Sequence, residues 1–272
     1  MTLYALPNIE TPGEITNEQL KVKVLTTEAI SFIFPDFKHS LIAKELEKFI
    51  LPGISTDDII NKHESQLKLS YIQSEFIFKL KQLISESKQD KLAKNRKSAS
   101  NEFIWFLLQN SGLIQENELD IKFNRLTFVY KLNFYDSFAD FTAERGNSIV
   151  WTLNNPHHSK LPKKTDSNHA ATSMIAAIQI NRRCLQKVFP ERMIGISVID
   201  DKFTFYSTKI AVNYLDEVFK GNVTQDLNIY QYPSKNGLSI CDEKERFEIL
   251  KILSNLKEYT MSLPVLSKRS YA

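Results

Sequence analysis

The order of the periodic segments in the middle of the chain is the feature that most constrains the fold. From Asn101 onward, an amphipathic helix precedes three strand-like runs, and a second amphipathic helix precedes two more. In chain order, the expected segments are 101–110, 127–134, 138–143, 148–153, 169–187, 193–199 and 202–207. This mixture of helices and strands predicts an α/β fold.

Turn and cap signals support these boundaries. Gly146 and Asn147 supply the positive φ that a tight hairpin needs between the second and third strands. The later hairpin is expected to turn at Asp200-Asp201. A last amphipathic helix is expected from Asp242 to about Tyr259, and it closes the predicted core.

Composition divides the chain into three regions. Residues 1–24 are polar and are broken by Pro7 and Pro12, so they predict a loosely attached N-terminal arm. Residues 25–100 carry helical periodicity and predict a helical accessory region that ends in a basic linker. Residues 101–272 then form the α/β core with its C-terminal helix.

The basic linker lies between Ser85 and Ser100. Its cationic residues are Lys88, Lys91, Lys94, Arg96 and Lys97, and the segment holds almost nothing to bury. A solvated surface is the favoured interpretation of such a run. A phosphate-contacting patch and a nuclear localisation signal are the alternatives.

Overall charge and hydropathy exclude some classes of protein. The net charge of +3 from 35 basic and 32 acidic residues is too small to indicate nucleic-acid binding by itself. No stretch approaches the length of a membrane helix, and the first residues lack the pattern of a signal peptide. The expectation is a cytoplasmic or nuclear protein without a membrane partner. Cys184 and Cys241 are isolated and indicate neither a disulfide framework nor a zinc motif.

Five segments carry a resemblance to a known family. They are Asn101-Glu102-Phe103, Ala139-Asp140-Phe141-Thr142, the helix Ser173–Gln179, Met193–Ser197 and Phe203–Tyr206. In this order they resemble the core of the PD-(D/E)XK nuclease superfamily, in particular the nuclease-like domains of fungal and Crinkler-type proteins and of type I restriction subunits. The resemblance covers about 40% of the chain. It implies a restriction-endonuclease-like mixed β-sheet flanked by helices, here with an N-terminal helical extension.

The resemblance also implies a metal site. In the family, carboxylates at adjacent strand ends hold one or two divalent cations, and a lysine stabilises charge on the phosphate. Asp140 matches the metal-binding aspartate and Glu102 matches the helix glutamate, so both are candidate catalytic and metal-binding residues, with Mg²⁺ or Mn²⁺ as the cofactor of an active site. Each residue also has a structural interpretation. Asp140 is suited to capping a turn, and Glu102 is a first-turn glutamate that the helix dipole favours.

The strand that should supply Glu/Asp-x-Lys lacks both charges. It reads Ile149 to Asn154, and neither Trp151–Leu153 nor Thr152–Asn154 contains a carboxylate or a lysine. Glu144 shares a face with Asp140 but stands about 13 Å away along the strand, too far to share one metal. A lysine from the following loop is able to reach the site, but it does not replace the missing carboxylate. The catalytic set is therefore degenerate.

Two functions from different classes follow. The first is a catalytically degenerate nuclease-fold protein that binds nucleic acid, DNA or RNA, or a protein partner. Its candidate phosphate-binding residues are Lys160, Lys163, Lys164, Arg182 and Arg183. The alternative is an active metal-dependent nuclease in which Asp140 and Glu102 are helped by Glu144 or a loop lysine. A third possibility is an unrelated α/β interaction protein.

The enzyme alternative makes a direct prediction. If Asp140 holds a catalytic metal, Asp140→Asn should abolish both Mn²⁺ binding in isothermal titration and Mg²⁺-dependent cleavage of nucleic acid. Cleavage that survives unchanged in the variant would contradict this assignment.

Overall fold

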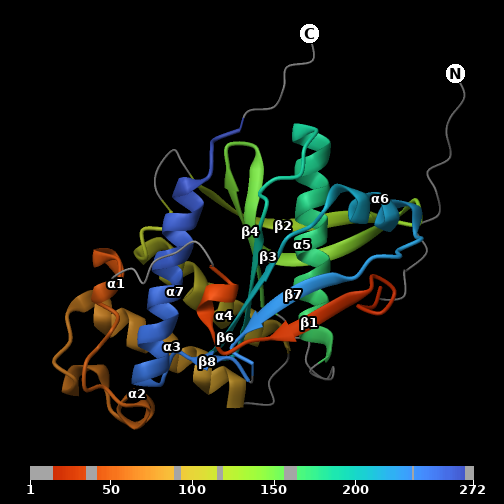
Figure 1. The fold of residues 1–272 in the computed structure, drawn as a ribbon. Helices are drawn as coiled ribbons and strands as arrows, with labels where there is room; N and C mark the ends of the chain where they lie inside the picture. The colour runs from red at the N-terminus through yellow and green to blue at the C-terminus, as the bar shows by residue number, and fades with distance from the viewer. Residues whose placement is uncertain are drawn as a thin grey trace, which may run out of the picture.

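The computed structural model describes residues 15–34, 42–88, 93–114, 119–155, 164–234 and 236–266, which form a mixed sheet with helices on both faces (Figure 1). Its strands are β1 (Val22–Thr26), β2 (Asp120–Tyr130), β3 (Asn133–Arg145), β4 (Ser148–Asn154), β5 (Met193–Ile199), β6 (Lys202–Thr208), β7 (Leu227–Tyr232) and β8 (Leu238–Ser239). Its longer helices are α3 (Tyr71–Lys88), α4 (Ala93–Asn110), α5 (Lys164–Leu185), α6 (Val212–Lys220) and α7 (Glu243–Ser262). The short helical segments are η1 (Ile30–Phe32), α1 (Lys44–Glu47), α2 (Thr56–Asn61) and η2 (Glu64–Gln66).

The sheet is mixed because two of its strand pairs are parallel. The strand order is β1-β7-β6-β5-β4-β3-β2, with β8 pairing beside β6. The pairs β4–β5 and β1–β7 are parallel, and the other pairs are antiparallel. Helix α5 connects the parallel neighbours β4 and β5, as such a pair requires. The predicted class, an α/β protein with a mixed sheet flanked by helices, is confirmed.

Two features of the structure differ from the boundaries predicted from the sequence. The N-terminal arm was expected to end at residue 24, but β1 spans Val22–Thr26 and pairs in register with β7. The predicted strand 127–134 is divided by a turn at Lys131 and Leu132, whose φ angles are 51° and 62°. A two-residue hairpin turn with positive φ usually contains Gly or Asn, and neither occurs here, so the sequence held no signal for it.

The basic segment is helical at both of its described ends, in the last turn of α3 and the first turns of α4. Helix α4 begins at Ala93, so the backbone of 93–100 is helical and continues into the expected helix 101–110. Residues 89–92 lie outside the described ranges. Of the helix expected at 39–50, residues 39–41 lie outside the described ranges, and within 42–50 only the four residues of α1 are helical, because the chain turns after Glu47.

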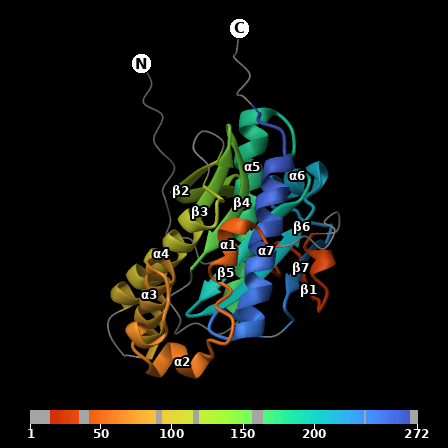
Figure 2. The ribbon, with the colours of Figure 1, turned by 90° about the vertical axis from the view of Figure 1, so that its left-hand side faces the viewer.

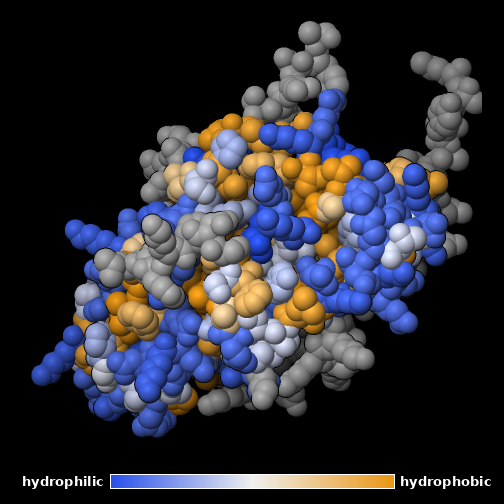
Figure 3. All heavy atoms as spheres, in the orientation of Figure 1, coloured by the Kyte–Doolittle hydropathy of each residue, from blue (hydrophilic) through white to orange (hydrophobic). Residues whose placement is uncertain are grey.

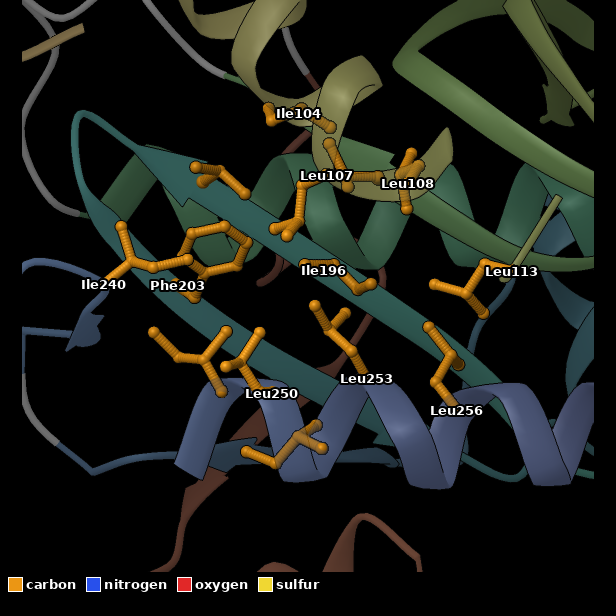
Figure 4. Close-up of a cluster of buried hydrophobic side chains, with 14 of the residues drawn as sticks. Ile104, Leu107, Leu108, Leu113, Ile196, Phe203, Ile240, Leu250, Leu253 and Leu256 are labelled. Carbon is orange, nitrogen blue, oxygen red and sulfur yellow. The ribbon is translucent and has the colours of Figure 1, made fainter. Parts of the chain in front are cut away.

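Each face of the sheet has its own hydrophobic core. On one face, α4 contributes Ile104, Leu107 and Leu108 and α7 contributes Leu250, Leu253 and Leu256, and these side chains converge on Ile196 and Phe203 of the sheet (Figure 4). On the other face, α5 and α6 pack against β2, β5, β6 and β7. Figure 2 shows α4 and α7 beside the sheet, with α2 and α3 beyond its lower end. In Figure 3, hydrophilic residues predominate over this lower region, while hydrophobic residues are exposed between α6 and α7.

Small side chains bring α5 close to the sheet. Ala170, Ala171, Ala176 and Ala177 are fully buried in this helix. Opposite them, a Cβ placed on Gly195 would lie 3.1 Å from Sδ of Met174, a tight contact that glycine avoids. Among the described residues, every helix is too short or too polar to cross a lipid bilayer.

A buried arginine joins the accessory region to the core. Arg246 of α7 has no exposed surface, and its guanidinium donates to five backbone carbonyls. The acceptors are the carbonyl oxygens of Ile50 (3.0 Å), Leu51 (3.4 Å), Ile54 (3.0 Å), Ile240 (3.3 Å) and Cys241 (3.0 Å). Burial lowers the pKa of this guanidinium from its ordinary value. One side chain therefore fixes the 50–54 loop against the segment that precedes α7.

Replacing this arginine should destabilise the whole chain. Arg246→Met fills similar volume but leaves buried carbonyls without donors, so the free energy of unfolding should fall by about 3 kcal/mol or more. Chemical denaturation followed by circular dichroism measures the change. Lys244→Met, at an exposed position two residues earlier, is the matched control and should change stability by less than about 0.5 kcal/mol. Equal stability of the two variants would contradict the structural role of Arg246.

Candidate functional site

The candidate site begins at an irregularity in β3. Between the pairs Lys122↔Thr142 and Asn124↔Ala139, β2 advances by two residues and β3 by three. The extra residue places Ala139 in the core beneath α5 and Phe141 in the core beneath α4 and α7. Asp140 lies between them. A β-bulge re-aims a side chain, and bulges occur often beside functional sites.

The carboxylate of Asp140 is held by the end of the neighbouring strand. Its Oδ2 accepts a hydrogen bond of 2.6 Å from the backbone N–H of Asn155, the residue that follows β4. The side-chain amide of Asn155 in turn donates to Oδ1 of Asn101 on α4, at 2.8 Å. This chain of contacts brings together the predicted strand aspartate, the end of β4 and the predicted first helix.

The pairing of β3 with β4 identifies the β4 residues that lie beside Asp140 in the sheet. Phe141 pairs with Leu153 and Thr142 with Thr152. Since cross-strand partners share a face and side chains alternate along β4, Thr142, Thr152 and Asn154 lie on one face of the sheet. Trp151 and Leu153 point into the opposite core. Of the two registers considered for the Glu/Asp-x-Lys strand, Thr152 and Asn154 therefore lie on the face toward α5 and Trp151 and Leu153 on the other.

Thr152 and Asn154 already have a common partner on α5. Oγ of Ser173 lies 3.2 Å from the hydroxyl of Thr152, and it accepts from Nδ2 of Asn154 at 3.0 Å. The Ser173 hydroxyl also donates to the carbonyl oxygen of Ala170 at 3.0 Å. All three polar side chains are buried. These hydrogen-bonded side chains form a neutral set at the end of β4.

The other two candidate carboxylates, Glu102 and Glu144, lie in different surroundings. The side chain of Glu102 is exposed on α4. Glu144 forms an ion pair of 2.6 Å with Lys122, and this hydrogen bond raises the pKa of the lysine. Within the described ranges, no group of three or more His, Cys, Asp and Glu side chains is arranged to hold a metal ion.

The candidate phosphate-binding residues lie at two separate places. Lys164 is the first residue of α5, and Lys160 and Lys163 belong to the segment outside the described residues. Arg182 and Arg183 lie in the last turn of α5. They are nine residues or more beyond Ser173, which is about 13 Å along a helix. Arg182 is also paired with Asp216 at 2.7 Å, so the structure does not bring these arginines to Asp140.

Several site residues were not identified from the sequence. Asn154 pairs with Ser197 of β5, and Ser197 pairs with Thr204 of β6, so three polar residues form one cross-strand row. Oδ1 of Asn154 and Oδ1 of Asn155 are buried, and in the structure neither accepts a hydrogen bond. The available signal was a polar residue within an otherwise apolar strand, such as Ser197 in Met193–Ile199.

Comparison of the sequence with models of protein families finds no match, and no curated protein matches the chain significantly.

The neutral set should contribute measurably to stability. Ser173→Ala removes the partner of both Thr152 and Asn154, so the free energy of unfolding should fall by about 2 kcal/mol. Ser100→Ala is the matched control, because the buried hydroxyl of Ser100 has no hydrogen-bond partner in the structure. The control should change stability by less than about 1 kcal/mol. Urea denaturation of both variants tests the difference, and a reversed order would contradict the hydrogen-bond assignment.

Proposed function

We propose that this chain is a catalytically degenerate protein with a PD-(D/E)XK nuclease-like core, which acts as a binding module for nucleic acid. The observation that carries the proposal is the combination of a bulged aspartate on β3 with a neutral, hydrogen-bonded set on β4. A protein partner is the competing outcome of the experiment below.

The arrangement of elements supports the first part of this proposal. Helix α4, the meander β2–β3–β4, the crossover helix α5 and strand β5 follow one another as in the resembled family. Asp140 lies on the second of these strands, at a bulge, and β4 ends beside it. Chemistry-bearing residues in an open α/β sheet commonly gather at the carboxyl ends of parallel strands, and β4 and β5 both end here.

The charge of the site supports the second part. A two-metal phosphodiester site needs several carboxylates, because hard cations are held by anionic oxygen ligands. Here the end of β4 beside Asp140 carries Thr152, Asn154 and Asn155, whose side chains supply only neutral oxygens. One carboxylate with neutral oxygens is a poor match to a pair of divalent cations, so these residues do not fit the family's metal centre.

The chain near the N-terminus of α5 supplies the cations for phosphate contact. Lys160, Lys163 and Lys164 follow Asn155 closely in the sequence and lead into α5. The N-terminal end of a helix also favours anions, since its backbone N–H groups are directed outward. A nucleic-acid backbone at this end would meet both features. Arg182 and Arg183, at the other end of α5, would lie away from it.

The test is the salt dependence of binding to a labelled single-stranded oligonucleotide. We expect affinity to fall steeply as salt is raised. For Lys163→Gln/Lys164→Gln, the slope of log K against log salt should be smaller by about 1.4, the loss expected for two phosphate contacts on a single strand. Arg182→Gln/Arg183→Gln removes the same charge from the other end of α5 and should leave the slope unchanged. Fluorescence anisotropy measures all three proteins.

Two results would overturn the proposal in different ways. Absence of binding at low salt would exclude the nucleic-acid module and redirect attention to a protein partner, whose apolar contacts would be insensitive to salt. Metal-dependent cleavage of the oligonucleotide that disappears in Asp140→Asn would restore the active nuclease.

A further inference from the structure

A cavity of about 430 Å³ lies beside the candidate site. Its charged lining is Asp200, Asp201 and Lys202, and its uncharged polar lining includes Thr204, Tyr206, Gln231 and Asn236. These residues come from the β5–β6 turn, from β6 and β7, and from the segment that precedes β8. The first turn of α5 adds Ser167 to the lining, and this end of the helix is the lower one in Figure 1.

Cross-strand pairs of residues connect the lining of the cavity with the end of β4 beside Asp140. Thr204, which lines it, pairs with Ser197, and Ser197 pairs with Asn154. The next row joins Thr152, Gly195, Tyr206 and Gln231 across four strands. Both rows lie on the face that α5 covers, since Gly195 faces Met174 and Asn154 contacts Ser173. A ligand that extends along the strand ends would therefore reach from one to the other.

The lining is suited to the edge of a nucleobase. Carboxylates accept hydrogen bonds from the exocyclic amino group of cytosine, and side-chain amides such as that of Gln231 match the donor and acceptor of adenine. The two carboxylates outnumber the ammonium group of Lys202, so the net negative charge of the lining favours a base over the phosphate backbone. Both carboxylates already have polar or charged neighbours: Oδ2 of Asp201 accepts from the hydroxyl of Ser239, and Asp200 has an interaction of its own. A carboxylate has two oxygens, so each is still able to accept from a base.

The volume agrees with this class of ligand. Pockets for small molecules commonly enclose roughly 300–1,000 Å³. The cavity lies in the lower part of that range, which suits one nucleoside. Single-stranded nucleic acid presents such bases without a pairing cost.

From these observations we infer that the cavity holds one unpaired nucleobase that carries an amino group. The inference rests on the proposed function, because it supplies the base-reading part of the same nucleic-acid module. The strand would contact the N-terminal end of α5 through its phosphates and place a base against Asp200 and Gln231.

The experiment compares labelled single-stranded dodecamers of dC, dA and dT with the full chain. Thymine lacks an exocyclic amino group, so dC and dA should bind about tenfold more tightly than dT. Asp200→Gly removes the carboxylate at a position where φ is 53°, which glycine adopts readily, and should abolish that preference.

Asp226→Gly is the matched control. It deletes a carboxylate at the opposite end of β7, about 16 Å along the strand from Gln231. Asp226 is ion-paired with Lys23 on the exposed sheet edge, a contact of low energetic value. The control should keep the preference of the unaltered protein. Free deoxycytidine should compete with the dC dodecamer if the pocket reads the base itself, and failure to compete up to millimolar concentration would place the recognition elsewhere.

The outcomes separate the inference from the function on which it rests. Equal affinity for dC, dA and dT, with the steep salt dependence retained, would overturn the base pocket and leave the nucleic-acid module intact. Absence of binding to every dodecamer would overturn both. A preference for dC and dA that persists in Asp200→Gly would contradict the assignment to this cavity.

Discussion

The packing of α5 against the sheet is the constraint on which the rest of the structure depends. Parallel β4 and β5 can be neighbours only if the chain returns over one face, and α5 makes that return. Its buried alanines and the absence of a side chain at Gly195 allow a close approach. Because α5 is close, the hydroxyl of Ser173 reaches Thr152 and Asn154. The contacts of Ser173 in the candidate site thus depend on the small side chains of α5 and on Gly195.

The side chains around Ser173 in this geometry are all neutral. Carboxylates clustered at strand ends repel one another and need a cation to be stable, whereas Thr152, Asn154 and Ser173 satisfy much of their hydrogen-bonding potential among themselves. Asp140 keeps its place through the backbone N–H of Asn155. Neutral side chains hold this arrangement without the repulsion that clustered carboxylates would cause, which is consistent with the proposed role in binding. The cavity beside it extends the same polar face.

The accessory region belongs to the same folded body as the core. Arg246 connects α7 to the carbonyl oxygens of the 50–54 loop, and β1 extends the sheet beyond β7. Contacts therefore cross the boundaries that composition suggests between the arm, the helical region and the core. Since buried carbonyls of both regions share one donor group, loss of that group should affect both regions together.

The sequence by itself determined the local elements and the absence of charge in β4. Alternation predicted most strands of the core, Gly146 adopts the positive φ expected of its turn, and Asp242 caps α7 through the N–H groups of Lys244 and Glu245. Each of these signals involves neighbours in the chain, and the absence of charge in β4 is likewise visible in the sequence. Only the tertiary structure decided the bulge at Asp140, the β1–β7 pair and the carbonyls around Arg246. The β1–β7 pair and most of the Arg246 contacts join residues about 200 positions apart. The bulge depends on how β3 pairs with β2. Contacts of these kinds leave no periodic pattern in the sequence.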